Sequence, residues 1–485
     1  MLDSTTSPRF HATDDWADFT NHGLLVAAHS YVQDLGFYSA IDRFLSFKMK
    51  TRDFSWQDKF KTLFASILVG CDHTSQINSR LGPDERAAAA LLGLERFPDQ
   101  SQINRLLTRA TPEHLPQMRA LHLHLLSRHS RARARKHWAR LANRQPVLFL
   151  DLDQRALVVS SNQYQLSSKG HFGRKRGRYG YQLSLAFLGG ALGEVVDEYL
   201  DPGTTPAASR VSDLLASASA FCAALHITPN ELVVRGDAQY GTPAIIKKIE
   251  AFGFHYLFKG LSSARARRLL ERVAPETIFH HVENGEAREP AWMADLSTLT
   301  HRHGRTPSPE TDISARTLLL VRHLLERPRR RPDPKTRARS AADATDRVRV
   351  RKVDYFLTSL APHQLPLEAV LETYHDRATI ERYFADEAYG LGTRQVRTHH
   401  HAGQALFQLL VATTNNLLRW MKHSLFKNTP IERMGISRLV HTAMQIPARI
   451  KRWGDRPLVE FPKRHHLIAA LATTWAPMIP SVRDA

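Results

Sequence analysis

The spacing of apolar residues changes along the chain and predicts helical regions around an α/β core. In residues 1–140 apolar side chains recur at helical spacing, as in the stretch from Phe60 to Val69. From residue 146 the pattern changes to short apolar runs, PVLFLDLD and ELVVRGD, which are typical of buried strands. Strand-like and helix-like segments then alternate up to residue 260. This order predicts an α/β fold with a mixed sheet.

The rest of the chain suggests an insertion, a return to the core and a tail. Residues 261–350 are rich in Pro and Arg but contain two strand-like pieces, which predicts an inserted subdomain with some β-structure. A long helix that contains Glu381 follows this insertion. We therefore expect five parts: a helical N-terminal region at 1–140, the first part of the core at 146–260, the insertion at 261–350, the second part of the core at 351–425 and a helical or mixed C-terminal region at 426–485.

The excess of basic over acidic residues indicates the kind of binding partner. Lys and Arg number 67 against 47 Asp and Glu, which gives a net charge of +20 with His neutral. Such an excess favours a polyanionic partner, and nucleic acid is the leading candidate; an ordinary basic protein is the alternative. With two cysteines, no secretory signal and no apolar run long enough to span a bilayer, we expect a cytoplasmic, nucleoid-associated protein without a disulfide framework.

Acidic residues stand where a metal-dependent phosphoryl-transfer site would need them. Asp151 and Asp153 end one predicted buried strand and share a face, Asp237 ends the next, and Glu381 lies in the later helix. Each acid taken singly has an ordinary explanation as a turn former, a helix cap or a solvated helix residue. Two acids that end core strands are costly to bury without a cation, so their combination favours a metal site. Carboxylate ligands of this kind suit Mg²⁺.

Three further residues make the interpretation specific. Tyr374, Arg377 and Glu381, separated by two and three residues, resemble the tyrosine–arginine–glutamate motif of DDE-type transposases from bacterial insertion sequences. RGDAQYG, which contains Asp237, is similar to the segment with the second Asp of that family. LDLDQ, which contains Asp151 and Asp153, resembles the segment with the first. The resemblance extends over about residues 90–425.

The resemblance implies an RNase H-like core that cuts and joins DNA. Asp153, Asp237 and Glu381 would hold two Mg²⁺ ions, which Mn²⁺ can replace, while Tyr374 and Arg377 would lie near DNA phosphates. Water would release a 3′-hydroxyl at the element's end, and that hydroxyl would then attack target DNA. The partners would be the terminal inverted repeats and the target DNA, bound by a homodimer in a synaptic complex.

Two departures from the family pattern leave choices open. Arg155 stands where the family usually has Thr two positions after its first Asp, so both Asp151 and Asp153 remain candidates, with Asp153 preferred. Ala388 stands where the family often has Lys, so a cation that contacts the DNA backbone would come from elsewhere, and Arg394 is our candidate.

A basic loop after the first pair of acids is a further candidate for DNA contact. It interleaves cations with an aromatic ring that could stack on an unpaired base, and a solvated hairpin is the alternative. The candidate residues are Arg174, Lys175, Arg176, Arg178 and Tyr179.

Two other functions remain open. One is a structure-selective endonuclease on the same fold, which would cut DNA without joining it. The other is a catalytically inactive, transposase-derived regulator that only binds DNA, an alternative that Ala388 keeps open.

Overall fold

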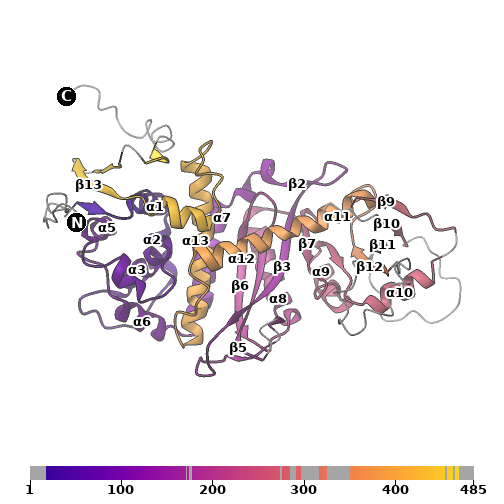
Figure 1. Ribbon diagram of the computed structural model, residues 1–485, viewed down its shortest axis with the longest axis horizontal. Coiled ribbons are helices and arrows are strands. Elements are labelled where there is room, and N and C mark those ends of the chain that lie inside the picture. Colours follow the sequence, from indigo (N-terminus) through magenta and orange to yellow (C-terminus); the bar gives the residue numbers. More distant parts are fainter. Residues whose placement is uncertain are drawn as a thin grey trace, which may run out of the picture. The chain divides into compact units, whose positions relative to one another are not determined.

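The structure, a computed structural model, divides into two compact units built from segments that are distant in the sequence (Figure 1). Unit 1 comprises Met1–His129, Leu157–Ser167 and Phe384–Ala485, and unit 2 comprises Ser130–Ala156 and Ser168–Tyr383. The described residues are 18–170, 172–173, 177–273, 276–283, 291–296, 316–324, 350–453, 456–462 and 465–468.

Unit 1 is mainly helical and is organised around one long buried helix. Its helices are α1 (Gly23–Asp34), α2 (Phe37–Phe44), α3 (Trp56–Leu68), α4 (Gln76–Arg80), α5 (Arg86–Leu91), α6 (Gln100–Arg109), α7 (His114–His129), α13 (His401–Leu425) and α14 (Ile436–Arg438). Most residues of α13 are buried, and this helix packs against α3, α6 and α7. Helices α1 to α7 lie within the described part of residues 1–140.

A small antiparallel sheet completes unit 1. It pairs β1 (Phe19–Thr20) with β13 (Ala448–Trp453), and β13 with β14 (Arg456–Glu460). Within the described ranges of both units, no helix is long and apolar enough to cross a membrane.

Unit 2 is built on one mixed sheet. Its strands are β2 (Ala139–Arg140), β3 (Pro146–Val158), β4 (Ser168–Lys169), β5 (Tyr179–Leu188), β6 (Glu194–Pro202), β7 (Leu232–Gly236), β8 (His255–Lys259), β9 (His280–Val282), β10 (Ala291–Asp295), β11 (Arg316–Leu324) and β12 (Val350–Thr358). Their order is β4-β5-β3-β7-β8-β12-β11-β10-β9, with β6 beside β5 and β2 beside β3. Strands β3, β7 and β8 are parallel, whereas β12 is antiparallel to β8, so the predicted mixed α/β sheet is confirmed.

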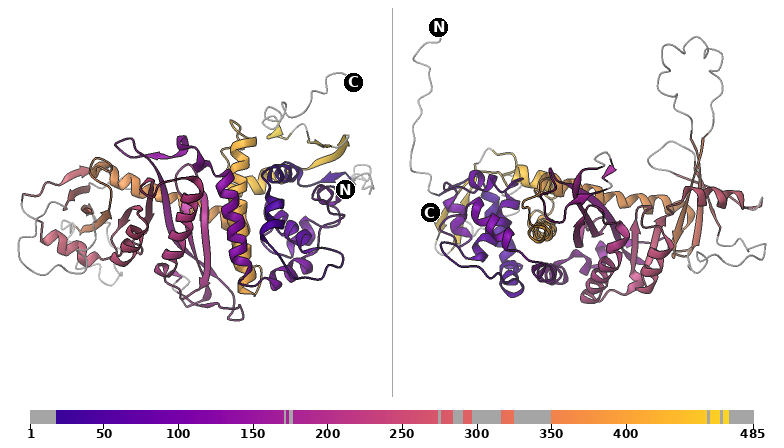
Figure 2. Two further views of the ribbon diagram at one scale, coloured as in Figure 1. Left: turned by 180° about the vertical axis from the view of Figure 1, so that it is seen from behind. Right: turned by 90° about the horizontal axis from the view of Figure 1, so that it is seen from below.

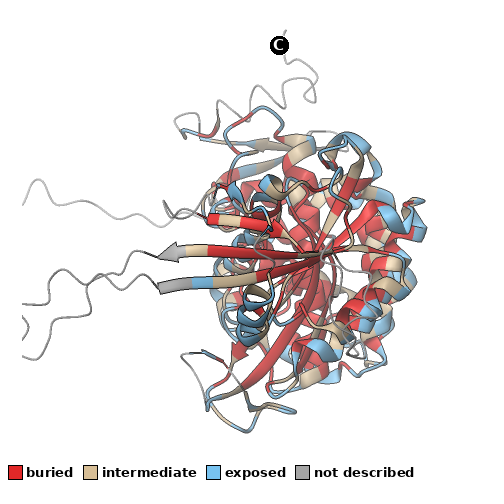
Figure 3. Cartoon of the chain, turned by 90° about the vertical axis from the view of Figure 1, so that its right-hand side faces the viewer, coloured by how far each residue is buried: buried red, intermediate tan, exposed pale blue. Residues whose placement is uncertain are grey.

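Helices cover the sheet of unit 2. They are α8 (Val211–Leu225), α9 (Pro243–Ala251), α10 (Ser263–Glu271) and α11 (Leu367–His375). A further helix, α12 (Thr379–Gly390), begins in unit 2 and continues into unit 1. α8 packs on β5 and β6, and α9 packs on β8. α11 crosses the opposite face of the sheet (Figure 2). Because both faces are covered, the central strands are buried along most of their length (Figure 3).

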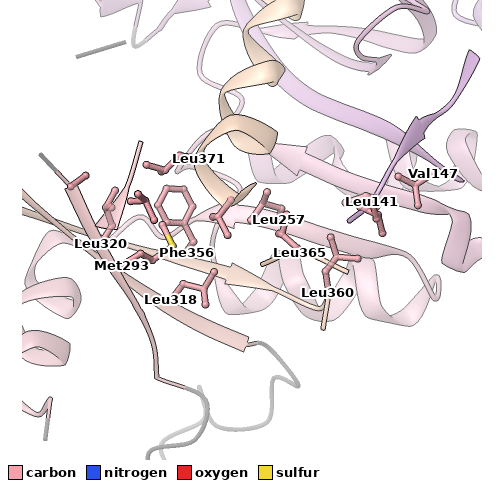
Figure 4. Packing of buried hydrophobic residues seen from close by; sticks show 14 residues of the cluster. Leu141, Val147, Leu257, Met293, Leu318, Leu320, Phe356, Leu360, Leu365 and Leu371 are labelled. Atoms are coloured by element: carbon pink, nitrogen blue, oxygen red, sulfur yellow. The ribbon is translucent and has the colours of Figure 1, made fainter. Parts of the chain in front are cut away.

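Strands from the predicted insertion extend the main sheet. β9 to β11 lie within residues 261–350, and β12 begins at Val350; β12 pairs directly with β8 of the core. One hydrophobic cluster joins these strands to the core: Met293, Leu318 and Leu320 lie near Phe356, and the cluster continues through Leu257 toward Val147 (Figure 4). The insertion therefore shares its hydrophobic core with the main sheet.

Two local predictions are wrong. The strand predicted to end at Asp151 and Asp153 continues to Val158, because half-buried residues after the acids still fit the sheet, so both acids lie inside β3. The long helix predicted after the insertion is also interrupted: a 3₁₀ turn at Asp376–Ala378 separates α11 from α12. This turn tightens the chain between Tyr374 and Glu381.

Candidate active site

The candidate site is built on the parallel strands β3 and β7. In their register Asp151 pairs with Arg235 and Leu152 pairs with Gly236. The next position places Asp153 beside Asp237, which directly follows β7. Because side chains alternate between the faces of a sheet, all four polar residues point to the same face. They form two layers, which we call the inner pair (Asp151 and Arg235) and the outer pair (Asp153 and Asp237).

The inner pair is a buried ion pair. Both side chains are inaccessible to solvent, and Arg235 donates from Nε to Asp151 Oδ1 over 2.7 Å and from Nη2 to Oδ2 over 2.9 Å. Arg235 Nη1 donates to the Thr373 carbonyl oxygen of α11, and the guanidinium lies 4.1 Å from the ring centroid of Phe149. Burial raises the pKa of Asp151, and the charge of Arg235 opposes that rise.

A glycine leaves the space that this ion pair occupies. A Cβ atom at Gly189 would lie 2.3 Å from Asp151 Oδ2 and 2.8 Å from Arg235 Nη2. Any larger residue there would push the two charged groups apart. The inner pair therefore links β3, β7 and α11 through contacts that leave no room for rearrangement.

The outer pair brings two carboxylates together. The side chain of Asp153 keeps 18% of its accessible surface, whereas that of Asp151 keeps none. Burial raises the pKa of Asp153 to about 6, and the negative charge of Asp237 adds to the rise. Asp237 Oδ1 accepts a hydrogen bond of 2.8 Å from the backbone N–H of Gln239 in the turn after β7. Two neighbouring acids of this kind attract a cation.

Arg377 supplies one cation. Its Nη1 lies 3.3 Å from Asp153 Oδ2, so a residue of the tyrosine–arginine–glutamate pattern contacts a residue of the first strand pattern. Tyr374 lies under this guanidinium, with 5.6 Å between Arg377 Cζ and the ring centroid, and its ring meets Phe356 edge-on at 5.2 Å. These contacts place Tyr374 and Arg377 beside the outer pair.

Glu381 lies one helical turn beyond Arg377. It is exposed in the first turn of α12, whereas Arg377 lies in the 3₁₀ turn that precedes this helix. Across the part of the chain that the structure describes, no three His, Cys, Asp or Glu side chains are grouped closely enough to hold a metal ion. Asp153 and Asp237 are adjacent, whereas the structure does not group Glu381 with them.

The donors fit a hard divalent cation. Asp153 and Asp237 offer carboxylate oxygens side by side, which are the ligands that Mg²⁺ and Mn²⁺ prefer. Arg377 neutralises one oxygen and leaves the others available.

A tyrosine beneath the outer pair was not foreseen from the sequence. Tyr240 is 1% exposed, and its hydroxyl has no hydrogen-bond partner among the described residues. Burial, together with the charges of Asp153 and Asp237, raises its pKa well above the usual value. Its ring lies against Gly236, where a Cβ atom would approach Tyr240 Cδ2 to 2.9 Å.

The basic residues predicted to contact DNA are only partly described. Arg174, Lys175 and Arg176 lie outside the described residues. Arg178 is exposed, and the Tyr179 ring lies 5.5 Å from Lys169 Nζ. Arg394, which belongs to unit 1, has its Cζ 5.6 Å from the ring centroid of Tyr389.

Adjacent carboxylates on parallel strands are an arrangement that metal-dependent phosphoryl transfer can use. The family model described as "Transposase DDE domain group 1" matches residues 9–479. The chain belongs to this family of DDE-type transposases. A comparison with curated proteins found no match.

Proposed function

We propose that the protein cleaves DNA at the ends of a bacterial insertion sequence and joins those ends to target DNA. The observation that carries the proposal is the outer pair, in which Asp153 and Asp237 lie side by side with Arg377 on Asp153. The match to the family model over residues 9–479 supports the same assignment. We further propose that the central sheet of unit 2 is an RNase H-like core.

Asp153, Asp237 and Glu381 are the proposed ligands of divalent ions, Mg²⁺ or Mn²⁺. The bound ions would stabilise the charge that develops on the phosphate as one oxygen attacks and another leaves. Asp153 is preferred to Asp151 because Arg235 already occupies both carboxylate oxygens of Asp151. Asp151 is then a structural acid that holds the strand bearing Asp153.

The protein's own residues would position the DNA. Arg377, already within 3.3 Å of Asp153, can turn one N–H toward a phosphate oxygen while keeping its place over Tyr374. Arg178 and Tyr179 are proposed to hold the DNA backbone, together with Arg174, Lys175, Arg176 and Arg394. We assign recognition of the terminal inverted repeats to residues 1–140, and pairing of two ends to a homodimer.

The test is DNA cleavage with a matched pair of variants. The protein is incubated with Mg²⁺ and DNA that carries its own flanking terminal repeats, as wild type, Glu381→Gln and Glu368→Gln. Glu368 is an exposed glutamate in the first turn of α11, so its variant controls for the loss of one negative charge. We expect cuts at the repeat ends with wild type and Glu368→Gln, and at least a roughly 10³-fold loss with Glu381→Gln.

Joining is measured in the same reaction by adding a target plasmid. Joined products establish a transposase, whereas cleavage without joining assigns the protein to the structure-selective endonucleases. If wild type binds the repeats but cuts with neither Mg²⁺ nor Mn²⁺, the catalytic proposal is rejected in favour of a DNA-binding regulator.

A further inference from the structure

Helix α6 of unit 1 presents one continuous polar face. With 100° between successive residues, Ser101, Asn104, Arg105, Thr108 and Arg109 fall within an arc of about 140°, and all five are exposed. The opposite arc holds the apolar residues Ile103, Leu106 and Leu107, each fully buried. The division between the two faces leaves hydroxyl, amide and guanidinium groups directed to solvent.

The polar face carries positive charge, and its nearby acid is Asp99, whose pKa is lowered by a hydrogen bond with Ser101 and further by the charge of Arg105. Neither Arg105 nor Arg109 forms an ion pair with a carboxylate of the described residues. Asp99, the acid at the start of α6, is used as the helix cap: its Oδ1 accepts from the backbone N–H groups of Ser101 and Gln102 over 2.7 and 3.1 Å. A surface with free guanidinium groups on a protein of net charge +20 fits a polyanion.

The helix is held rigidly. Its apolar side packs on α3 and α13, and a Cβ atom at Gly403 of α13 would fall 2.1 Å from the Leu107 carbonyl oxygen, so the two backbones lie in close contact. At the other end Asn78 Oδ1 accepts from the backbone N–H of Gln100 over 2.8 Å. A helix fixed at both ends loses little conformational freedom on binding.

From these observations we infer that the polar face of α6 enters the DNA major groove and reads the terminal inverted repeats. This inference rests on the proposed function and names its recognition element. The major groove, about 12 Å wide, admits one α-helix. Asn pairs in bidentate fashion with adenine, and Arg with guanine, so we assign base reading to Arg105, inside the face, and to its chain neighbour Asn104, at the edge of the face opposite Arg109. Arg109, at the edge of the face in the last turn, contacts a phosphate.

The experiment measures DNA binding in EDTA, so that it does not depend on metal chemistry. Fluorescence anisotropy compares a duplex of the element's own terminal repeat with a scrambled duplex at several KCl concentrations. Wild type is expected to prefer the terminal duplex, and the double variant Asn104→Ala/Arg105→Ala is expected to lose about 10- to 100-fold in affinity for it. Affinity of that variant for the scrambled duplex changes much less.

Two further variants separate base reading from charge. Arg105→Lys keeps the charge but not the planar fork, so it should lose preference for the terminal duplex while retaining the salt dependence of wild type. Arg109→Ala should weaken binding to both duplexes and lower the slope of log affinity against log salt by about one. The control is Arg86→Ala: Arg86 is exposed on α5, at the other end of the unit 1 helices from α6 (Figure 1), and its loss should leave the preference intact.

Three results would overturn the inference: wild type that binds both duplexes equally, a double variant that keeps the preference, or Arg86→Ala that loses it. Unfolding is excluded by thermal melts, since alanine at exposed helix positions preserves the helix. Failure of the proposed chemistry is distinguishable. If wild type never cuts DNA but the α6 variants lose the preference for the terminal duplex, the inference about α6 is supported and the catalytic proposal is not. If the α6 variants cut DNA and keep the normal preference, the inference about α6 is rejected and the catalytic proposal stands.

Discussion

The inner and outer pairs lie two residues apart along the same two strands, yet the inner pair joins opposite charges and the outer pair joins like charges. Asp151 meets a guanidinium that satisfies both of its oxygens, and the pair is closed to solvent. Asp153 meets another carboxylate, remains partly accessible and has its pKa raised to about 6. A buried acid whose two oxygens are both paired with a guanidinium stabilises a fold. A buried acid beside a like charge, as Asp153 is even with Arg377 3.3 Å away, favours the binding of a further cation.

The largest expected effect comes from removing one charge of the outer pair. Asp237→Asn should reduce cleavage by at least about 10³-fold, because a ligand of the proposed ions is lost while the shape of the side chain is kept. The free energy of unfolding should stay unchanged or rise, since repulsion from Asp153 is relieved. Cleavage assays and urea unfolding measure the two quantities. Retention of more than a tenth of wild-type cleavage would remove Asp237 from the site.

The inner pair should respond in the opposite manner. Arg235→Met leaves Asp151 buried without its partner, so the free energy of unfolding should fall by about 3–5 kcal/mol. The double variant Asp151→Leu/Arg235→Met should recover much of that loss because no unpaired charge remains. Urea unfolding at pH 7 is the measurement. A double variant as unstable as Arg235→Met would show that the contacts of the ion pair hold β3 to β7, and that the unpaired charge of Asp151 is not the cause of the loss.

A smaller effect should appear as a pH dependence. The pKa of Asp153 is about 6 in the folded protein and about 3.9 in an unfolded chain, so the folded state binds this proton more tightly. Stability should therefore fall as pH rises from about 4 to 6, and Asp153→Asn should be more stable than wild type by about 2 kcal/mol above that range, without divalent ions. Below pH 4 the difference should vanish.

Divalent ions provide the control for this pH effect. At pH 7.5, Mg²⁺ should raise the melting temperature of wild type and leave that of Asp153→Asn unchanged. If the stability difference between wild type and Asp153→Asn persisted unchanged at pH 3.5, its cause would be packing and not the charge of Asp153.

The smallest effect is expected at Tyr240. Because its hydroxyl is buried without a partner among the described residues, Tyr240→Phe should change the free energy of unfolding by no more than about 1 kcal/mol in metal-free protein, and in the stabilising direction. Thermal and urea unfolding measure this. A destabilisation larger than 1 kcal/mol would mean that the hydroxyl bonds to the outer pair in solution.

Part of this arrangement was predictable. The apolar runs before Asp151 and Asp237 predicted two buried strands, because strands covered on both faces need uninterrupted apolar residues. The extension of β3 to Val158 was missed because the polar residues after Asp153 resemble a turn. Arg235 was a usable signal: an arginine within the buried run ELVVRGD requires a buried acid as its partner.

The partner of Arg235 could not be chosen from the sequence. Asp151 lies 84 positions away, and only the register of β3 against β7 decides that Arg235 meets Asp151 and leaves Asp153 to Asp237. A shift by one residue would direct these side chains to different faces. The position of the insertion strands beside β8 likewise depends on pairing between distant segments. The local sequence therefore shows which residue types the site contains, but their roles depend on the pairing of distant segments.

The 3₁₀ turn at Asp376–Ala378 has a consequence for sequence drift. Tyr374 lies at the end of α11, Arg377 in the 3₁₀ turn and Glu381 at the start of α12. Their spacings of three and four residues match the side-chain repeats of a 3₁₀ turn and of an α-helix. The residues between these positions are not equally free to change, because Ile380 is fully buried and Asp376 Oδ2 lies 3.5 Å from Arg235 Nη1. Inserting or deleting one residue between Arg377 and Glu381 would rotate Glu381 by about 100° relative to Arg377. We expect the motif to tolerate replacement of the exposed Ala378 and to be lost through a change in the number of intervening residues.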